Sequence, residues 1–169
     1  MTITKINNIL EIVENRDLML YEHLERTSLL SFALAKSLNL NPKEKEQAYF
    51  SGLLHDIGKV FDIEELGTNH FDIGSSILKL INDLEDVSEF IKNINEKWNG
   101  EGFPNKLKEE DIPLISRIVS IANFYDNLRF VEEMSHEDAI SKLRSLSGIN
   151  FDPNMIEPFI TIIEQENLI

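Results

Sequence analysis

The sequence predicts an all-α fold, a single-domain bundle of about seven or eight helices. Apolar residues recur at intervals of three and four along most of the chain, which is the helical period. Only seven Gly and five Pro interrupt the 169 residues, and no convincing pair of strands is present. The chain is long enough for one hydrophobic core and too short for two ordinary domains, so we expect residues 1–169 to form one domain.

The charge balance narrows the class of partner. Thirty acidic and 16 basic residues give a formal net charge of −14, which repels nucleic acids and anionic membranes. A phosphate-bearing small molecule still fits, because a bound cation and a few basic groups can reverse the sign of the charge locally. The sequence has no Cys, no signal peptide and no apolar run of membrane-spanning length. We therefore expect a cytoplasmic protein.

The first half of the chain is expected to form four helices. Apolar spacing predicts a short helix around residues 6–13 and a long one over about 18–38. A third helix is expected over about 42–54, because Asn41 is a capping residue, Pro42 suits the first turn, and Glu44 completes a capping box. Residues 61–68 resemble a short acidic connection. A fourth helix is expected to open at Asn69-His70 and to continue through Ile81.

The second half is expected to form four more helices, over about Leu84–Ile94, Pro113–Asp126, Ser135–Leu146 and Asn154–Glu164. The loop over residues 97–104 has two glycines, an aromatic residue on each side and a proline, which indicates a shaped loop.

The strongest chemical signal is His55-Asp56, which follows the third helix and precedes Gly58 and Lys59. Neighbours within a helix lie about 100° apart, but at a helix end the backbone can bend and bring both side chains to one ion. Imidazole and carboxylate together suit a divalent transition metal, and Lys59 places a positive charge where a phosphate could meet that ion. An ordinary helix end with a capping glycine and a solvated lysine is the alternative interpretation.

Three further histidines bear on this site. His23 lies three residues before Arg26 on the second helix, where a half-buried polar residue is the simpler interpretation. His70 lies near a helix N-terminus, where the helix dipole favours the neutral imidazole that a metal requires. His136 follows the capping residue Ser135, and we expect it at the surface.

The order of these motifs resembles the HD-GYP subgroup of the HD superfamily of metal-dependent phosphohydrolases. The resemblance extends from about residue 20 to 160 and rests on His23-x-x-Arg26, Leu-Leu-His55-Asp56-Ile-Gly58-Lys59, His70-x-x-x-Gly74, Glu96-x-Trp-Asn-Gly100-x-Gly102-Phe103-Pro104, Ile112-Pro113, Arg117-Ile-x-x-x-Ala-Asn123-x-Tyr-Asp126 and Phe151-Asp152-Pro153.

This resemblance implies an all-helical bundle that holds two or three iron or manganese ions and hydrolyses cyclic di-GMP or related cyclic dinucleotides. It implies that His23, His55 and Asp56 are metal ligands, with Asp56 shared between metals, and that His70 is a ligand of the second metal. It also implies a contact between Lys59 and the scissile phosphate. We expect Asp56 and Lys59 to be catalytic, and the residues expected to bind substrate are Arg26, Lys59, Gly102, Phe103, Pro104 and Arg117.

The chain departs from the family pattern at several expected ligand positions. Where the family has His-His-Glu, this sequence has Ile94-Asn95-Glu96, and Ile94 continues the apolar stripe of its helix, which predicts a core position. Asn123 replaces an Asp and is at most a weak ligand, because an amide lacks the formal charge of a carboxylate. Phe103 replaces the Tyr of the glycine loop, so the hydroxyl is lost.

Two hypotheses follow. The first is a phosphohydrolase or phosphodiesterase reduced to a mononuclear site, with one Mn or Fe ion per chain and weak or altered activity on a phosphate ester or nucleotide. The second is an inactive domain that holds no metal and binds a nucleotide, a cyclic dinucleotide or a protein partner in signalling. The residues leave both open, and they do not define an oligomeric state.

Overall fold

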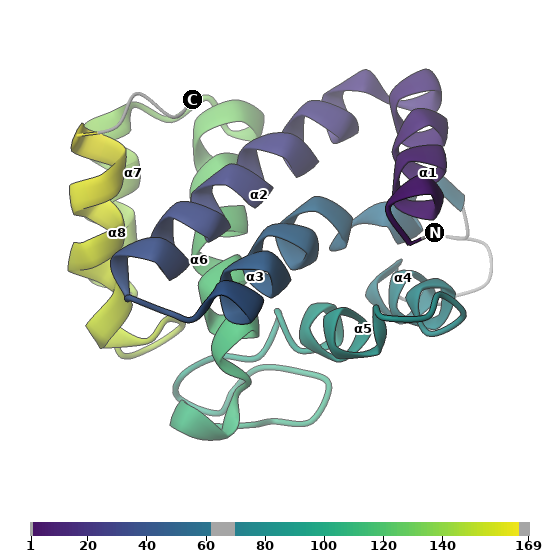
Figure 1. Cartoon of the computed structure of the whole chain (residues 1–169). Helices are drawn as coiled ribbons and strands as arrows, with labels where there is room; N and C mark the ends of the chain where they lie inside the picture. The colour runs from purple at the N-terminus through teal and green to yellow at the C-terminus, as the bar shows by residue number, and fades with distance from the viewer. Residues whose placement is uncertain (1, 62–69, 166–169) are drawn as a thin grey trace.

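The computed structural model describes residues 2–61 and 70–165, so most of the predicted acidic connection over 61–68, together with Asn69, lies outside the described residues. Eight α-helices make up most of the described chain, and no strand occurs in it apart from one isolated bridge between Ser147 and Phe151 (Figure 1). The predicted all-α fold is confirmed.

The second and third helices closely match their predicted ranges, whereas the first is longer than the predicted 6–13. The three helices are α1 (Thr2–Arg16), α2 (Leu18–Ser37) and α3 (Pro42–Leu54). The Asp17 carboxylate accepts from the backbone N–H of Leu20 and caps α2. At α3 the predicted capping box is present, because the Asn41 side chain accepts from the Glu44 N–H and the Glu44 carboxylate accepts from the Asn41 N–H. Local sequence therefore determines where these helices begin.

The later elements are α4 (His70–Leu78), α5 (Glu85–Lys92), α6 (Leu114–Asp126), α7 (His136–Ser145) and α8 (Pro153–Gln165). A 3-10 helix, Ile57–Phe61, follows α3, and a π-helical turn, Asn127–Val131, extends α6. The predicted end of α5 was wrong, because Ile94 lies beyond the helix. The predicted core position of Ile94 is confirmed, since its side chain is 4% exposed within the main hydrophobic cluster.

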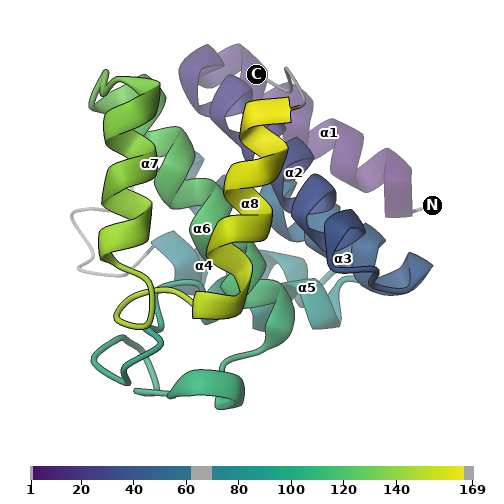
Figure 2. The ribbon, with the colours of Figure 1, turned by 90° about the vertical axis from the view of Figure 1, so that its left-hand side faces the viewer.

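The core consists of two hydrophobic clusters, and α2 contributes to both. Leu30 and Leu34 belong to the cluster built largely by α6, α7 and α8, whereas Leu20 and Leu24 belong to the cluster built with α1, α4 and α5. Figures 1 and 2 show α6, α7 and α8 at one end of the molecule and α1, α4 and α5 at the other. The middle of α2 therefore lies where the two halves of the bundle meet.

A glycine sets the spacing between α2 and α3. A Cβ atom on Gly52 would lie 2.7 Å from the Cα of Ser28 and 2.9 Å from the carbonyl oxygen of Thr27, so no larger residue fits here without a shift of the backbone. This close approach brings the residues that follow α3 against the N-terminal half of α2, where His23 lies.

Candidate metal centre

Three of the predicted metal ligands come together in the described structure. Nε2 of His23 lies 3.2 Å from Nε2 of His55, and Oδ2 of Asp56 lies 3.6 Å and 3.3 Å from these two nitrogens. All three side chains are buried. They form a group whose ligand atoms all lie within 4.8 Å of one another, which is close enough to share one ion.

The second ring nitrogen of each histidine fixes its tautomer. Nδ1 of His23 lies 2.6 Å from Oδ2 of Asp126, and Nδ1 of His55 lies 2.8 Å from the carbonyl oxygen of Gly52. Both oxygens accept hydrogen bonds, so each Nδ1 is assigned as the donor and each Nε2 keeps its lone pair. Two imidazole lone pairs and a carboxylate oxygen that converge in this way fit a divalent cation, and the hydrogen bonds on Nδ1 orient the rings for it.

The electrostatics of the cluster also favour positive charge. Burial by itself raises the pKa of Asp56, but the facing imidazoles of His55, His23 and His70 hold it well below its usual range. Burial lowers the pKa of His23, and its hydrogen bonds to Asp126 and Asp56 more than compensate, so the pKa of His23 is raised. Asp56 is therefore a carboxylate, and the cluster favours a proton or a metal cation beside it.

His70 approaches the other oxygen of Asp56. Nε2 of His70 and Oδ1 of Asp56 are 3.2 Å apart, and both atoms are buried without a hydrogen bond of acceptable geometry among the described residues. Buried polar atoms without a partner are rare and costly. This arrangement fits a second ligand position at which Asp56 would be shared between two cations, which is what the resemblance to the HD-GYP family implies.

Two basic side chains also lie beside these residues. Lys59 contacts Asp56 and is partly exposed, whereas Arg26 is bonded to Asp126. Nζ of Lys59 contacts Oδ2 of Asp56 while the side chain remains 43% exposed, so it can meet both the carboxylate and an incoming anion. Nε and Nη2 of Arg26 lie 2.6 Å and 3.1 Å from the two oxygens of Asp126, and the guanidinium lies 4.0 Å from the ring centroid of Phe130. Arg26 is therefore held in place by protein groups.

Two other predicted site residues, Asn123 and Arg117, are engaged by protein groups. Oδ1 of Asn123 accepts from Nδ2 of Asn127 at 2.8 Å, so this amide is engaged with its own helix. Nη1 of Arg117 lies 2.7 Å from Oδ2 of Asp152, in a buried ion pair.

Hydrogen bonds to the Glu96 side chain hold the segment that follows the glycine loop. The buried carboxylate of Glu96 accepts from the backbone N–H groups of Asn105 at 2.6 Å and Leu107 at 3.0 Å. A Cβ atom on Gly102 would lie 2.6 Å from the carbonyl oxygen of Asn95, so the loop packs directly on the backbone at Asn95. Phe103, which precedes Pro104 through a cis peptide bond, is 51% exposed. The shaped loop predicted for residues 97–104 is present.

Two residues, Asp126 and His136, make contacts that the sequence did not predict. Asp126 orients His23, and the signal for this was its position in the Tyr125-Asp126 motif at the end of a helix. The prediction of a surface position for His136 was wrong, because the residue is half-buried and its Nδ1 lies 2.8 Å from the hydroxyl of Tyr125.

A buried His-His-Asp cluster in an all-helical bundle defines a class of metal-binding fold. The chain belongs to the HD domain family, because the model of that family matches residues 8–155. The predicted resemblance to HD-GYP proteins is therefore confirmed at the level of the family. None of the helices in the described ranges is long and apolar enough to cross a membrane.

Among known proteins, the chain is 28% identical to a cyclic di-GMP phosphodiesterase of Thermotoga maritima, in a match covering 88% of this chain and 46% of that protein. It is 32% identical to a probable cyclic di-GMP phosphodiesterase of Vibrio cholerae, with 94% and 43% covered. A crystal structure of a cyclic GMP-AMP specific phosphodiesterase of V. cholerae superposes with a TM-score of 0.76 at 25% identity, over 96% of this chain and 48% of that one. The chain thus spans about half the length of these relatives.

Proposed function

We propose that this chain is a metal-dependent phosphodiesterase domain of the HD-GYP type in which one divalent cation, Mn or Fe, is well held. The observation that carries the proposal is the convergence of Nε2 of His23, Nε2 of His55 and Oδ2 of Asp56. The names of the relatives support a phosphodiester, such as that of a nucleotide or cyclic dinucleotide, as the substrate class.

The residues around the cluster support the chemistry of phosphate ester hydrolysis. A bound divalent cation polarises a phosphate oxygen and lowers the pKa of a coordinated water. Asp56 would supply the negative charge that holds the cation, and Asp126 keeps the ring of His23 in the tautomer that a cation requires. Lys59, half-exposed beside Asp56, offers an ammonium group to the charge that develops on phosphate oxygens.

A second cation would be held less well. The contact that supports it is the approach of Nε2 of His70 to Oδ1 of Asp56 at 3.2 Å. Ile94, which replaces an expected imidazole, is buried in the core, and the Asn123 amide is bonded to Asn127. Without two cations to clamp both the attacking and the leaving oxygen, turnover of cyclic dinucleotides is expected to be slow or altered.

The test combines metal content with turnover. Protein purified without chelator is analysed by elemental mass spectrometry and assayed with Mn²⁺ on bis(4-nitrophenyl) phosphate and on cyclic di-GMP. We expect one tightly held metal per chain and measurable hydrolysis, both lost in His55→Ala. The control is His136→Gln, which changes the one histidine whose contact is to Tyr125 and should retain both. Absence of metal and of turnover in the unmodified protein would overturn the proposal.

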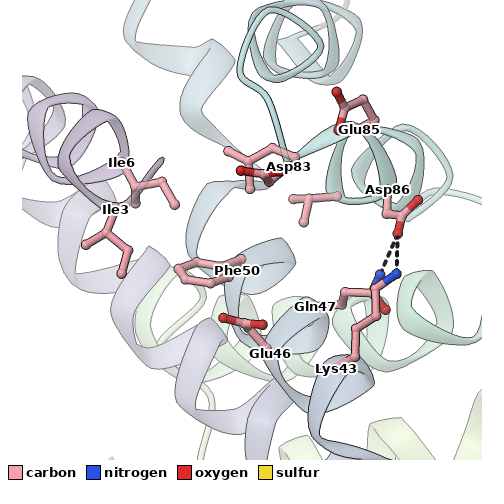
Figure 3. Close-up of a pocket in the computed structure, with 11 residues that line it drawn as sticks. Ile3, Ile6, Lys43, Glu46, Gln47, Phe50, Asp83, Glu85 and Asp86 are labelled. Carbon is pink, nitrogen blue, oxygen red and sulfur yellow. Dashed lines mark hydrogen bonds and ion pairs between the residues drawn. The ribbon is translucent and has the colours of Figure 1, made fainter. Parts of the chain in front are cut away.

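A second candidate function, a protein-binding module, is favoured by a groove whose lining includes no histidine. This hollow of about 480 Å³ lies between α1, α3 and the start of α5 (Figure 3). Its apolar lining is Ile3, Ile6, Phe50, Leu84 and Val87, and its acidic lining is Glu46, Asp83, Glu85 and Asp86. Lys43 and Gln47 both contact Asp86, at 3.2 Å and 2.8 Å.

The groove continues into an apolar hollow lined by Leu29, Phe32 and Tyr49, which shares Lys43, Glu46 and Phe50 with it. Apolar surface rimmed by acidic groups is complementary to an amphipathic helix that carries basic residues beside its apolar stripe. A second copy of this chain, with a net charge of −14, would instead meet charge of the same sign.

This candidate is tested with two synthetic amphipathic helices, one of Leu and Lys and one of Leu and Glu. We expect the Leu/Lys peptide alone to bind, and Glu46→Lys combined with Glu85→Lys to weaken binding at least tenfold without change in metal content. Equal binding of both peptides, no binding of either, or self-association of the chain through this face in sedimentation would contradict it.

A further inference from the structure

A third hollow has four carboxamide residues in its lining. It measures about 260 Å³ and lies where the segment after α5, the face of α6 and the connection between α7 and α8 meet. Its polar lining is Asn95, Asn123, Asn127, Asn150 and Ser120, and its apolar lining is Ile94, Phe124 and Phe151; Glu96 and Lys97 complete it. Several of these positions are ones at which the sequence departs from the family pattern.

The carboxamides leave hydrogen-bonding capacity unused. The side chains of Asn95 and Asn150 make no hydrogen bond to any other described residue. The bond from Nδ2 of Asn127 to Oδ1 of Asn123 leaves the NH₂ group of Asn123 and the oxygen of Asn127 with spare capacity. The hollow therefore offers both donors and acceptors to a ligand.

The charges around the hollow disfavour a metal ion. Amide oxygens carry no formal charge, and the lining includes a basic residue, Lys97. The only lining carboxylate, that of Glu96, already accepts the backbone N–H groups of Asn105 and Leu107. A neutral ligand with donors and acceptors of its own suits this environment better than a cation.

We propose that this hollow binds a single purine base. A carboxamide presents a donor and an acceptor side by side, which matches the edge of a nucleobase, as in the pairing of Asn with adenine N6 and N7. The rings of Phe124 and Phe151, with centroids 5.1 Å apart, supply the apolar wall that a planar base requires. The volume is below the roughly 300–1,000 Å³ of pockets for drug-sized ligands, so it admits one fused ring system rather than a whole dinucleotide.

The hollow adjoins the metal centre through α6. Asn123 and Asp126 are three residues apart, so they share a helix face and lie about 4.5 Å apart along the axis. Asp126 in turn bonds to His23 of the cluster. The inference thus names the substrate class of the proposed phosphodiesterase and rests on that function for the phosphate, whereas binding of the base itself requires no metal.

The test measures nucleoside binding in the presence of EDTA, by calorimetry or saturation-transfer NMR, with guanosine, adenosine and cytidine as probes. We expect a purine nucleoside to bind at least tenfold more tightly than cytidine. Asn95→Ala and Asn150→Ala are each expected to weaken that binding about tenfold, and neither substitution removes an internal side-chain hydrogen bond, so both variants should fold. Asn15→Ala, on α1, is the matched control and should bind like the unmodified protein.

The outcomes distinguish a failure of the base pocket from a failure of the proposed phosphodiesterase. No purine binding at millimolar concentration, equal binding of cytidine, or unchanged binding in both Asn variants would overturn the base pocket. If that happens while Mn²⁺-dependent turnover is present, the metal centre stands without the base pocket. Purine binding in EDTA combined with absent metal and absent turnover would support the base pocket and overturn the phosphodiesterase.

Discussion

At the scale of the residue, Asp126 determines the geometry of the cluster although it is not itself a member of it. Its carboxylate joins Nδ1 of His23 to the guanidinium of Arg26, with all contacts between 2.6 and 3.1 Å. A carboxylate behind a metal-binding imidazole fixes the tautomer and raises the basicity of the ring. Asp126 is fully buried, so Arg26 is needed to compensate its charge.

We expect Asp126→Asn to weaken Mn²⁺ binding by about 10- to 100-fold, the usual cost of losing such a partner. The amide loses the charge that pairs with Arg26 and can turn its NH₂ group towards Nδ1 of His23, which favours the wrong tautomer. Calorimetric titration with Mn²⁺ measures the effect.

Asp152→Asn is the matched control, because Asp152 is also a buried carboxylate paired with an arginine, Arg117, at 2.7 Å. Both variants are expected to lose stability in urea, by about 1–3 kcal/mol, since each leaves a buried charge partly unpaired. Only Asp126→Asn should change the metal affinity. Equal metal binding in the two variants would refute a positioning role for Asp126.

At the scale of the element, the 3-10 helix after α3 packs directly on the start of α4. A Cβ atom on Gly58 would overlap the carbonyl oxygen of His70 and lie 3.0 Å from the backbone nitrogen of Gly74. Gly58 therefore also allows the chain after α3 to pack closely against the start of α4. This contact holds His70 where its Nε2 reaches Asp56.

Gly58→Ala is expected to push α4 away and to separate His70 from Asp56. We predict a loss of about 2–4 kcal/mol of unfolding free energy, within the range for an overpacked site, and a lower Mn²⁺ affinity. Gly148→Ala is the control: φ is +73° there and no atom lies within 4 Å of the added Cβ, so only backbone strain of about 1–2 kcal/mol is expected, with metal binding intact. Urea denaturation and Mn²⁺ titration of both variants check this.

The capping box of α3 is a second element-scale device, and it acts on stability alone. Asn41→Ala removes the side chain that accepts the Glu44 N–H at 3.0 Å, at the exposed start of the helix that ends next to His55. We expect a loss of about 0.5–2 kcal/mol in urea denaturation.

Ser135→Ala removes the equivalent cap of α7, where the hydroxyl accepts the Asp138 N–H at 3.1 Å, and should cost a similar amount. Metal affinity should be unchanged in both variants, because the two-cluster core holds the ends of these helices. A large change in metal affinity for Asn41→Ala would show that the cap also positions the site.

At the scale of the whole molecule, the cluster joins two halves of the bundle. His23 comes from α2, His55 and Asp56 follow α3, and Asp126 ends α6, so that the His23–Asp126 bond joins residues 103 positions apart. A cation bound there would be held only by the folded chain. Metal binding is therefore expected to stabilise the fold by mass action.

Free Mn²⁺ at about 100 times its dissociation constant should raise the unfolding free energy by about 2.7 kcal/mol, and EDTA should reverse the gain. Thermal unfolding with and without Mn²⁺ measures it. His55→Ala should show no such shift, and His136→Gln should show all of it. A shift of equal size in His55→Ala would place the stabilising ion elsewhere on this acidic molecule, whose net charge is −14.

The sequence by itself determined the helical class and most helix ends, because caps and apolar periods act over a few residues. Asn41, Pro42 and Glu44 begin α3 where predicted, and the motif order named His23, His55 and Asp56, whose ligand atoms lie within 4.8 Å of one another. The end of α5 was misjudged because the apolar stripe through Ile94 continues as core packing after the helix has stopped.

Only the tertiary structure decided which groups hold one another. The pairing of Asp126 with both His23 and Arg26, the packing of Gly58 against His70, and the engagement of Arg117 by Asp152 all join residues far apart in the chain. Such contacts depend on how helices pack and leave no local periodic signal. The sequence therefore names the atoms that could hold a metal, and the packing of α2 against α3 and α6 brings them within reach of one ion.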